Sequence, residues 1–264
     1  MKSFKMSRTN YVILLPPSEG KNKGGDIIYS DVKNKNSFMD IHLNREYIYQ
    51  DLLDVIESSD EKTLEKVFDL KGNNLKEAIE NTKVLDQNQT LSSIDRYSGV
   101  MFKSIDYLSL NEDQKENFNS SVLFIDGMFG LLKPQDKIPN YKLKITSKIG
   151  SLNITKYWKE NLKQLFNKEF NEKLIIDILP EAHRKVVNFS KSKEHLSVIF
   201  YVKKGDKVKQ AGHESKVLKG EIIRYILEKD KVDKEYIKNF KHSLGYDYCE
   251  ELSGDNLVAF LKEE

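Results

Sequence analysis

Short apolar runs that end abruptly at turn residues constrain the fold of this chain more than any other feature. The first, Tyr11-Val12-Ile13-Leu14-Leu15, is stopped by Pro16-Pro17, and so short an aliphatic run fits a buried strand better than a helix. The loop that follows, residues 18–30, contains three glycines. Five further segments predict strands: 122–125, 142–146, 174–179, 196–202 and 257–261.

Helical spacing of apolar residues fills the stretches between these runs. It predicts helices over 46–57, 61–70, a segment beginning at Leu75, 154–169, 217–229 and 233–240. Strands interleaved with helices predict an α/β (mixed α+β) fold, with a mixed central sheet flanked by helices. No internal repeat or linker divides the chain. We therefore expect one domain over residues 1–264, with a helical hairpin inserted at about 46–81.

Composition and segment length restrict where the protein works. A hydrophobic fraction of 39% is too high for a disordered chain, and no apolar run approaches the roughly 20 residues of a membrane span. Lys2, Lys5 and Arg8 precede too short an apolar stretch for a secretion signal. We expect a cytoplasmic protein without a membrane partner. Cys249, the single cysteine, predicts neither a disulfide nor a metal cluster.

Charge is distributed unevenly along the chain. Residues 40–70 hold nine acidic and three basic side chains, whereas residues 183–220 hold ten basic and three acidic ones. Such asymmetry indicates a one-sided field that attracts a polyanion, although a lysine-rich surface can also serve solubility alone.

Polar groups follow four of the expected strands, which is where α/β proteins usually build sites. We expect these loops to meet in a basic cleft. The residues they contribute are Ser18, Glu19, Lys21, Lys133, His183, Arg184, Lys203 and Lys204.

The segment from Gly212 to Arg224 is the sharpest local signal. It is typical of a loop that enters a helix, where free backbone amides favour an anion near Ser215 and Lys216. Lys216, Gly220 and Arg224 share one helix face. The alternative is that Ser215 is only an N-cap and the cations are solvated.

Catalysis is left open by the residues themselves. His183 and His213 lie in polar surroundings and could exchange protons, and with Ser18 and Glu19 they are the catalytic candidates. The sequence has no Walker loop, no GxGxxG and no HExxH. We expect neither a metal site nor a cofactor.

Taken together, these motifs resemble the YaaA peroxide-stress family, in a divergent branch. The residues that carry the likeness are Leu14 to Lys21, Tyr97 to Val100, Gly127 to Pro134, Pro139 to Leu143, Tyr157-Trp158, Phe200 to Lys204, Gly212 to Arg224, Phe240 and Gly245-Tyr246. The resemblance implies a peroxide-stress protein that limits damage by intracellular iron. It also implies a mixed α/β fold, a positively charged cleft and a helix-hairpin-helix-like element for DNA. The matching element is residues 61–81, with Lys71 and Gly72 at its turn.

Two functions follow from these expectations. The first is DNA binding with little sequence specificity, in which cleft cations neutralise phosphates. Those cations are Lys21, Lys133, Arg184, Lys203, Lys204, Lys216 and Arg224. The alternative is an enzyme that acts on a nucleotide or another small phosphorylated ligand in the same cleft, with Glu19 or a histidine moving a proton. A third option, a protein-interaction scaffold, would need an exposed apolar patch.

Overall fold

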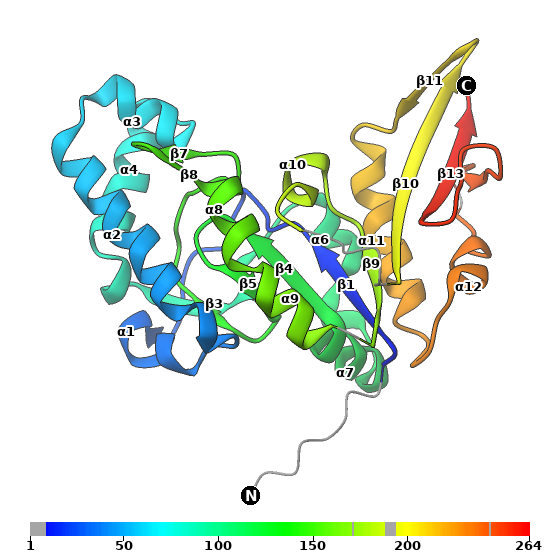
Figure 1. Ribbon diagram of the computed structural model, residues 1–264, viewed down its shortest axis with the longest axis horizontal. Helices are drawn as coiled ribbons and strands as arrows, with labels where there is room; N and C mark the ends of the chain where they lie inside the picture. Colours follow the sequence, from blue (N-terminus) through cyan, green and yellow to red (C-terminus); the bar gives the residue numbers. More distant parts are fainter. Residues whose placement is uncertain (1–8, 171, 188–193, 243) are drawn as a thin grey trace, which may run out of the picture.

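A mixed sheet runs through the centre of the protein, as the sequence predicts (Figure 1). The computed structural model describes residues 9–170, 172–187, 194–242 and 244–264. Its parallel strands lie in the order β4, β1, β9, β10, β13. Their bounds are Val122–Asp126, Tyr11–Leu15, Leu174–Asp177, His195–Lys204 and Leu257–Glu263. Antiparallel partners are β5 (Gly130–Leu132), β11 (Lys207–Gln210) and β12 (Asp247–Tyr248).

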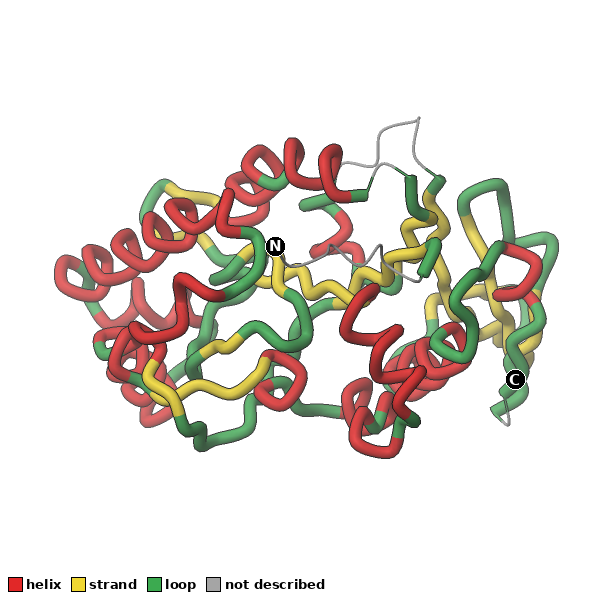
Figure 2. Tube along the Cα trace, turned by 90° about the horizontal axis from the view of Figure 1, so that it is seen from below, coloured by secondary structure: helices red, strands yellow, loops and turns green. Residues whose placement is uncertain are grey.

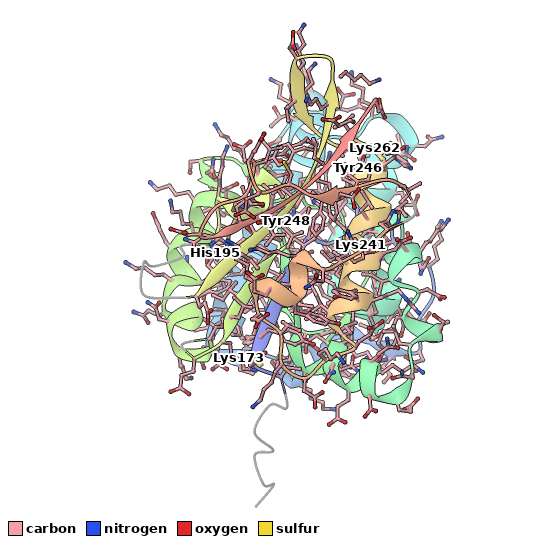
Figure 3. All side chains as sticks on the ribbon, turned by 90° about the vertical axis from the view of Figure 1, so that its right-hand side faces the viewer. Lys173, His195, Lys241, Tyr246, Tyr248 and Lys262 are labelled. Carbon is pink, nitrogen blue, oxygen red and sulfur yellow. The ribbon has the colours of Figure 1, made fainter. Side chains whose placement is uncertain are left out.

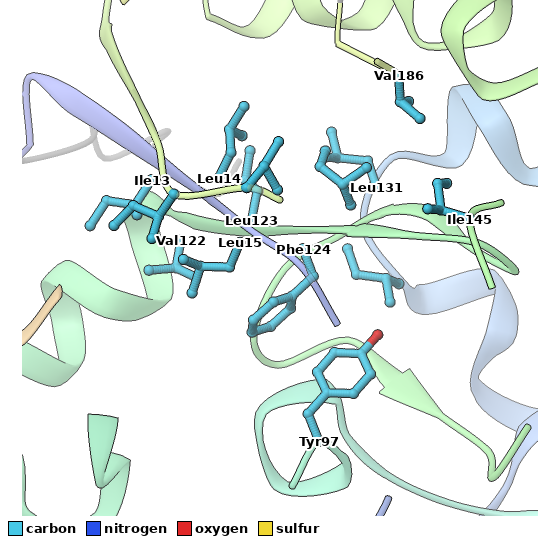
Figure 4. Packing of buried hydrophobic residues seen from close by; sticks show 14 of the residues in the cluster. Ile13, Leu14, Leu15, Tyr97, Val122, Leu123, Phe124, Leu131, Ile145 and Val186 are labelled. Atoms are coloured by element: carbon cyan, nitrogen blue, oxygen red, sulfur yellow. The ribbon is translucent and has the colours of Figure 1, made fainter. Parts of the chain in front are cut away.

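The middle of this sheet is the core of the molecule. Every residue of β1 is at most 2% exposed, because the strand is paired on both edges and covered on both faces. Figure 4 shows Ile13 and Leu15 of β1 beside Val122 and Phe124 of β4. Phe124 packs edge-on against Tyr97 with ring centroids 5.1 Å apart. Burial of this aliphatic surface is the main favourable contribution to folding.

Helices cover the sheet on both sides (Figure 2). In Figure 1, α8 (Ile154–Asn161) and α9 (Lys163–Glu169) lie in front of β4. The remaining helices near the sheet are α5 (Ser93–Arg96), α6 (Val100–Ile105), α7 (Glu112–Ser121), α10 (Glu181–Arg184), α11 (Glu214–Ile226) and α12 (Lys234–Lys238). Short 3-10 turns span Lys33–Lys35, Met39–Ile41, Leu85–Gln87 and Tyr107–Ser109.

The expected helical hairpin forms an arm at one end of the molecule, opposite the β10–β11 ribbon (Figure 1). It consists of α2 (His42–Ser58), α3 (Glu61–Phe68) and α4 (Gly72–Lys83). The Asp60 side chain caps α3 by accepting a hydrogen bond from the Thr63 amide. The turn between α3 and α4 uses two left-handed residues, since both Asp69 (φ 52°) and Gly72 (φ 55°) have positive φ.

Three predicted elements differ from the structure. Residues 142–146 form a loop and not a strand. Leu143 and Ile145 are buried, but the backbone there packs against Gly127, where a Cβ would lie 2.6 Å from the Leu143 carbonyl oxygen. The alternation of apolar residues and lysines over 142–146 therefore reflects burial of Leu143 and Ile145, and not pairing in a sheet. The helix expected over 154–169 is broken at Leu162.

The loop predicted over residues 18–30 also contains structure. It holds β2 (Ile27–Ile28) and the start of α1 (Tyr29–Val32). β2 pairs with β3 (Gln89–Ser92), which pairs in turn with β6 (Lys137–Ile138). A separate hairpin joins β7 (Lys148–Ile149) to β8 (Leu152–Asn153).

The strand order creates a switch point beside β1. From β1 the chain continues to β4 on one side, whereas from β9 it continues to β10 on the other. The loops after β1 and β9 therefore diverge and leave a crevice at the carboxyl ends of the strands. Crevices of this kind are where open α/β sheets bind ligands.

Helix α11 reaches this crevice because it packs closely on α6. A Cβ at Gly220 would lie 2.5 Å from the Ser104 Cβ and 2.7 Å from the Met101 carbonyl oxygen. Arg224 fastens the far end of the contact. Its Nη1 donates to the carbonyl oxygens of Ile105 (2.6 Å) and Asp106 (3.1 Å) and to Ser109 Oγ (2.9 Å).

The first turn of α11 is held from the opposite side by β13 and the segment before β12. Glu214 Oε2 accepts hydrogen bonds from Tyr246 Oη at 2.9 Å and from Lys262 Nζ at 3.3 Å. Figure 3 shows Tyr246 and Lys262 next to each other on this side of the molecule. Packing and hydrogen bonds together thus fix α11 at both ends.

Replacing Gly220 by alanine tests the α6–α11 contact. Overpacking costs about 1–3 kcal/mol, and because the new Cβ would meet the Met101 backbone we expect the upper part of that range, which outweighs the gain of about 1 kcal/mol in helix propensity. We expect a net loss of about 1–2 kcal/mol in the free energy of unfolding, measured by urea denaturation. The control is Gly212→Ala, whose new Cβ meets nothing within 4 Å. Equal stabilities of the two variants would contradict the contact.

Candidate functional site

A cavity of about 790 Å³ occupies the crevice at the switch point. Such a volume suits a ligand the size of a nucleotide. The cavity is lined by the loop after β1 (16–20), the segment 98–102, the loop after β9 (179–184), the middle of β10 (198–200), and Gln210, Ala211, Ser215, Lys216 and Lys219. Segments far apart in the sequence therefore meet here.

Two buried carboxylates stand at the strand ends on either side of β1. Asp126 ends β4 and is fully buried. Its Oδ1 accepts the amides of Met128 (2.7 Å) and Phe129 (3.0 Å), and its Oδ2 accepts the hydroxyls of Tyr97 (3.0 Å) and Tyr141. Burial, reinforced by Asp126, raises the pKa of both tyrosines, so both phenols remain donors. All the polar atoms of this group are satisfied internally.

Asp177 ends β9 in the same manner and is also fully buried. Its Oδ1 accepts the Leu179 amide at 2.8 Å, and its Oδ2 accepts Arg184 Nε and Ser197 Oγ, the latter at 3.1 Å. Burial alone would raise the pKa of Asp177, but hydrogen bonds from His195 and Arg184 and the Arg184 charge hold it below its ordinary value. Arg184 is thereby fixed at the cavity wall.

Lys21 lies behind the cavity wall, against the Asp126 group. Its Nζ donates to the Ser18 carbonyl oxygen at 3.1 Å and sits 4.2 Å from the centre of the Tyr141 ring. Burial lowers the pKa of Lys21 to about 8, although Asp126 and Glu19 oppose the shift. An amine with this pKa is mostly protonated at pH 7 and loses its proton at mildly alkaline pH.

His183 and Lys219 line the cavity, and the His183 Nδ1 and Lys219 Nζ atoms have no partner among the described residues. His183 Nδ1 is buried and has no hydrogen-bond partner in the described chain. Burial lowers the pKa of His183 to about 4, so the ring is neutral near pH 7. Burial likewise lowers the pKa of Lys219 to about 8, and Arg184 and Lys216 add to this while Asp177 opposes it. Unpaired polar atoms in such a place indicate a ligand site.

The start of α11 differs from the predicted anion site. The amides of Ser215 and Lys216 donate to the carbonyl oxygens of Gly212 (3.2 Å) and His213 (3.1 Å), so they are not free. Ser215 Oγ donates to the Gly212 carbonyl oxygen at 2.6 Å and is not an N-cap acceptor, since His213 occupies the cap. The lysine side chains, and not the backbone, supply the positive charge here.

Glu19 is part of a surface ion-pair chain. It pairs with Lys142 at 3.2 Å and with Lys144 at 2.9 Å, and Lys144 also pairs with Asp69 of the arm at 2.7 Å. Partial burial would raise the pKa of Glu19, but hydrogen bonds from the two lysines lower it on balance. Glu19 is therefore ionised near neutral pH and cannot donate a proton there. Ser18, the neighbouring residue, lines the switch-point cavity, as Glu19 does.

The remaining predicted residues lie away from the cavity. Lys71 and Gly72 are on the arm, Lys133 follows β5, and His213 is exposed. Lys203 and Lys204 pair with Glu263 (3.0 Å) and Glu264 (2.9 Å) on the β10–β11 ribbon. Arg224 is occupied by α6 carbonyls, as described above. Of the seven predicted cleft cations, only Arg184 and Lys216 line the cavity.

Sequence reasoning missed the residues that organise the crevice. Asp126 and Asp177 could have been found as the last residues of apolar strands, where a carboxylate interrupts the run. Lys219 lies three residues after Lys216, on the same side of α11. Tyr97 and Tyr141 lie in two of the segments that carry the family likeness, but nothing in the sequence indicates that the fold brings them to Asp126.

Metal clusters and membrane-spanning helices are both absent from the described residues. The described ranges contain no group of three or more histidine, cysteine, aspartate or glutamate side chains that could hold a metal ion. Within the same ranges, no helix is both long and apolar enough to cross a bilayer.

Replacing Asp177 by asparagine tests the Arg184 anchor. Breaking a buried ion pair leaves the guanidinium uncompensated, so we expect a loss of about 3 kcal/mol in the free energy of unfolding at pH 7. Because the pKa of Asp177 is lower in the folded than in the unfolded state, its contribution to the free energy of unfolding is present above pH about 4 and is lost as pH falls further. Unfolding measured from pH 7 to pH 3 should therefore show the two proteins converging. The exposed Asp206→Asn is the control, and a similar loss there would refute the anchor.

Comparison with known proteins places the chain in a family. The family model described as "Peroxide stress protein YaaA" matches residues 11–252 of the chain. A UPF0246 protein of Malacoplasma penetrans is 31% identical over 259 residues, which cover 95% of this chain and 98% of the relative. A UPF0246 protein of Rickettsia conorii is 27% identical over 215 residues, covering 80% of this chain and 86% of the relative. With nearly the whole described fold included in the match, this chain belongs to the YaaA peroxide stress protein family.

Proposed function

We propose that this protein acts in peroxide stress by binding a small phosphorylated molecule, of nucleotide size, in the switch-point cavity. The observation that carries the proposal is a set of polar groups with no internal partner around one cavity. Lys216 Nζ and Lys219 Nζ make no hydrogen bond or ion pair with another described residue, and His183 Nδ1 is buried without a partner. A phosphate would supply the missing acceptors.

Arg184 is suited to the same ligand. Asp177 and the Leu179 carbonyl engage its Nε and Nη2, which leaves Nη1 without a hydrogen bond in the part of the chain that is described. A guanidinium fixed in this way is preorganised for a phosphate oxygen. The lining also includes Val100, Met101, Phe102 and Phe200, apolar side chains against which the apolar part of a nucleotide could pack.

DNA binding is the second candidate, and the β10–β11 ribbon favours it. The ribbon extends from the sheet (Figure 1), and every residue of β11 is exposed. Lys207 and Lys209 make no ion pair with any described residue, whereas Lys203 and Lys204 are paired. Free lysines on a projecting ribbon would contact phosphates without reading bases. They can equally protect an edge strand from aggregation.

The cavity proposal is tested by titration calorimetry with inorganic phosphate, AMP and ATP. We expect Lys216→Met to weaken binding by about 10- to 100-fold, the cost of one charge-assisted hydrogen bond. The matched control, Lys207→Met, removes an equal charge from the ribbon and should leave affinity within about twofold, because exposed charges a Debye length apart are screened. No heat with any of the three probes, or equal losses in both variants, would contradict the cavity site.

The DNA candidate is tested separately with a fluorescent duplex at about 50 mM and 200 mM salt. Lys207→Met/Lys209→Met removes two phosphate contacts and should reduce the slope of log affinity against log salt by about 2. Lys216→Met should leave that slope unchanged if DNA uses the ribbon alone. Affinity that does not respond to salt would argue against DNA.

A further inference from the structure

Lys219 has features that phosphate binding alone does not require. Its side chain comes from the second turn of α11, lines the cavity, and faces no carboxylate within ion-pair distance among the described residues. Lysine ammonium groups at a protein surface need no such enclosure to attract phosphate. A partly enclosed amine without a counter-ion is instead the usual arrangement of a lysine that reacts as a nucleophile.

The surroundings of Lys219 keep part of its amine unprotonated. Burial lowers the pKa of Lys219 to about 8, and the charges of Arg184 and Lys216 add to this shift while Asp177 opposes it. An ordinary lysine has a pKa near 10.4, so at pH 7.5 the neutral fraction of Lys219 is on the order of 100-fold larger. Exposed lysines such as Lys207 do not share this environment.

His183 supplies the second group that a reacting amine needs. It lines the same cavity, it lies within electrostatic reach of Lys219, and its buried Nδ1 is unpartnered. A neutral imidazole has one donor and one acceptor nitrogen, so it can take a proton from one atom and return it to another.

We propose that Lys219 condenses with the carbonyl group of a phosphorylated aldehyde or ketone bound in this cavity. The inference rests on the proposed phosphate site and names its substrate class. The Lys219 nitrogen attacks the carbonyl carbon, a C–N bond forms, and the carbonyl π pair moves to oxygen. His183 relays a proton from nitrogen to that oxygen, giving a carbinolamine. A proton delivered by His183 then lets the hydroxyl leave as water while the nitrogen lone pair forms the C=N bond, and the remaining N–H proton returns to His183, so one amine and one carbonyl yield one neutral imine and one water.

The positions of the cations give them different roles toward the ligand. Lys216 and the free Nη1 of Arg184 hold the phosphate, while Lys219 reaches the carbonyl. The two lysines are three residues apart on one helix, and such residues are neighbours on its surface. A compact ligand can therefore contact both lysines at once.

Reductive trapping with a matched set of probes tests this inference. The full-length protein is incubated at pH 7.5 with pyridoxal 5′-phosphate, reduced with sodium borohydride, and mapped by peptide mass spectrometry. Pyridoxal lacks the phosphate and pyridoxine 5′-phosphate lacks the aldehyde. With pyridoxal 5′-phosphate we expect the Lys219 adduct to exceed those at Lys207 and Lys209 by at least about tenfold. Lys219→Arg, which keeps the positive charge but has no nucleophilic amine, should lose the dominant adduct.

The outcomes separate this inference from the proposed function. Binding of pyridoxine 5′-phosphate without preferential trapping at Lys219, or with trapping at Lys21 instead, overturns the reactive amine and leaves the phosphate site standing. Trapping at Lys219 by pyridoxal, with no binding of pyridoxine 5′-phosphate, supports the amine and overturns the phosphate site. Adducts spread in proportion to exposure, with no phosphate binding, overturn both.

Discussion

Two buried carboxylates, one on each side of β1, determine the architecture of the crevice. Asp126 and Asp177 each end a parallel strand, and each uses Oδ1 to accept a backbone amide from the turn that follows. An ionised carboxylate is costly to bury unless its acceptors are filled, so these turns are fixed in one conformation. The turn after Asp177 lines the cavity directly, whereas Asp126 holds Tyr97, which precedes the cavity-lining segment 98–102.

Because these carboxylates are already satisfied, Lys216 and Lys219 have no ion-pair partner among the described residues. Asp177 binds Arg184, and Asp126 binds two tyrosine hydroxyls. The two carboxylates that line the cavity are also paired, Glu19 with Lys142 and Lys144 and Glu181 with Lys185, so the electrostatic imbalance at Lys219 persists in the folded protein. Folding tolerates it because the excess positive charge is partly exposed to the cavity and its solvent. The imbalance is released when an anion binds or when an amine loses its proton.

The sequence allowed the sheet to be predicted, and the site only in part. Apolar runs such as 11–15 and 174–177 are dictated by burial on both faces, which leaves a local pattern. The 142–146 error shows the limit of that pattern, since alternating burial arises wherever a chain crosses a core. Arg224 was misplaced for a related reason. Its charge suggested a ligand, but the fold brings carbonyl oxygens of α6 to it.

Besides the buried hydrogen bonds that hold the arm to the core, such as those from Arg45 of α2 to the carbonyl oxygens of Phe129 and Leu131, a surface ion-pair chain links the arm to the crevice. Glu19, Lys144 and Asp69 form the ion-pair chain between them, and exposed pairs of this kind contribute about 0–1 kcal/mol each. The cavity walls, by contrast, are held by fully buried groups and by the α6–α11 contact. Losing the ion-pair chain would therefore leave the arm in place, because buried groups hold it, and the cavity and its unpaired cations would persist. The cavity is built without the arm, because none of the cavity-lining residues belongs to α2, α3 or α4.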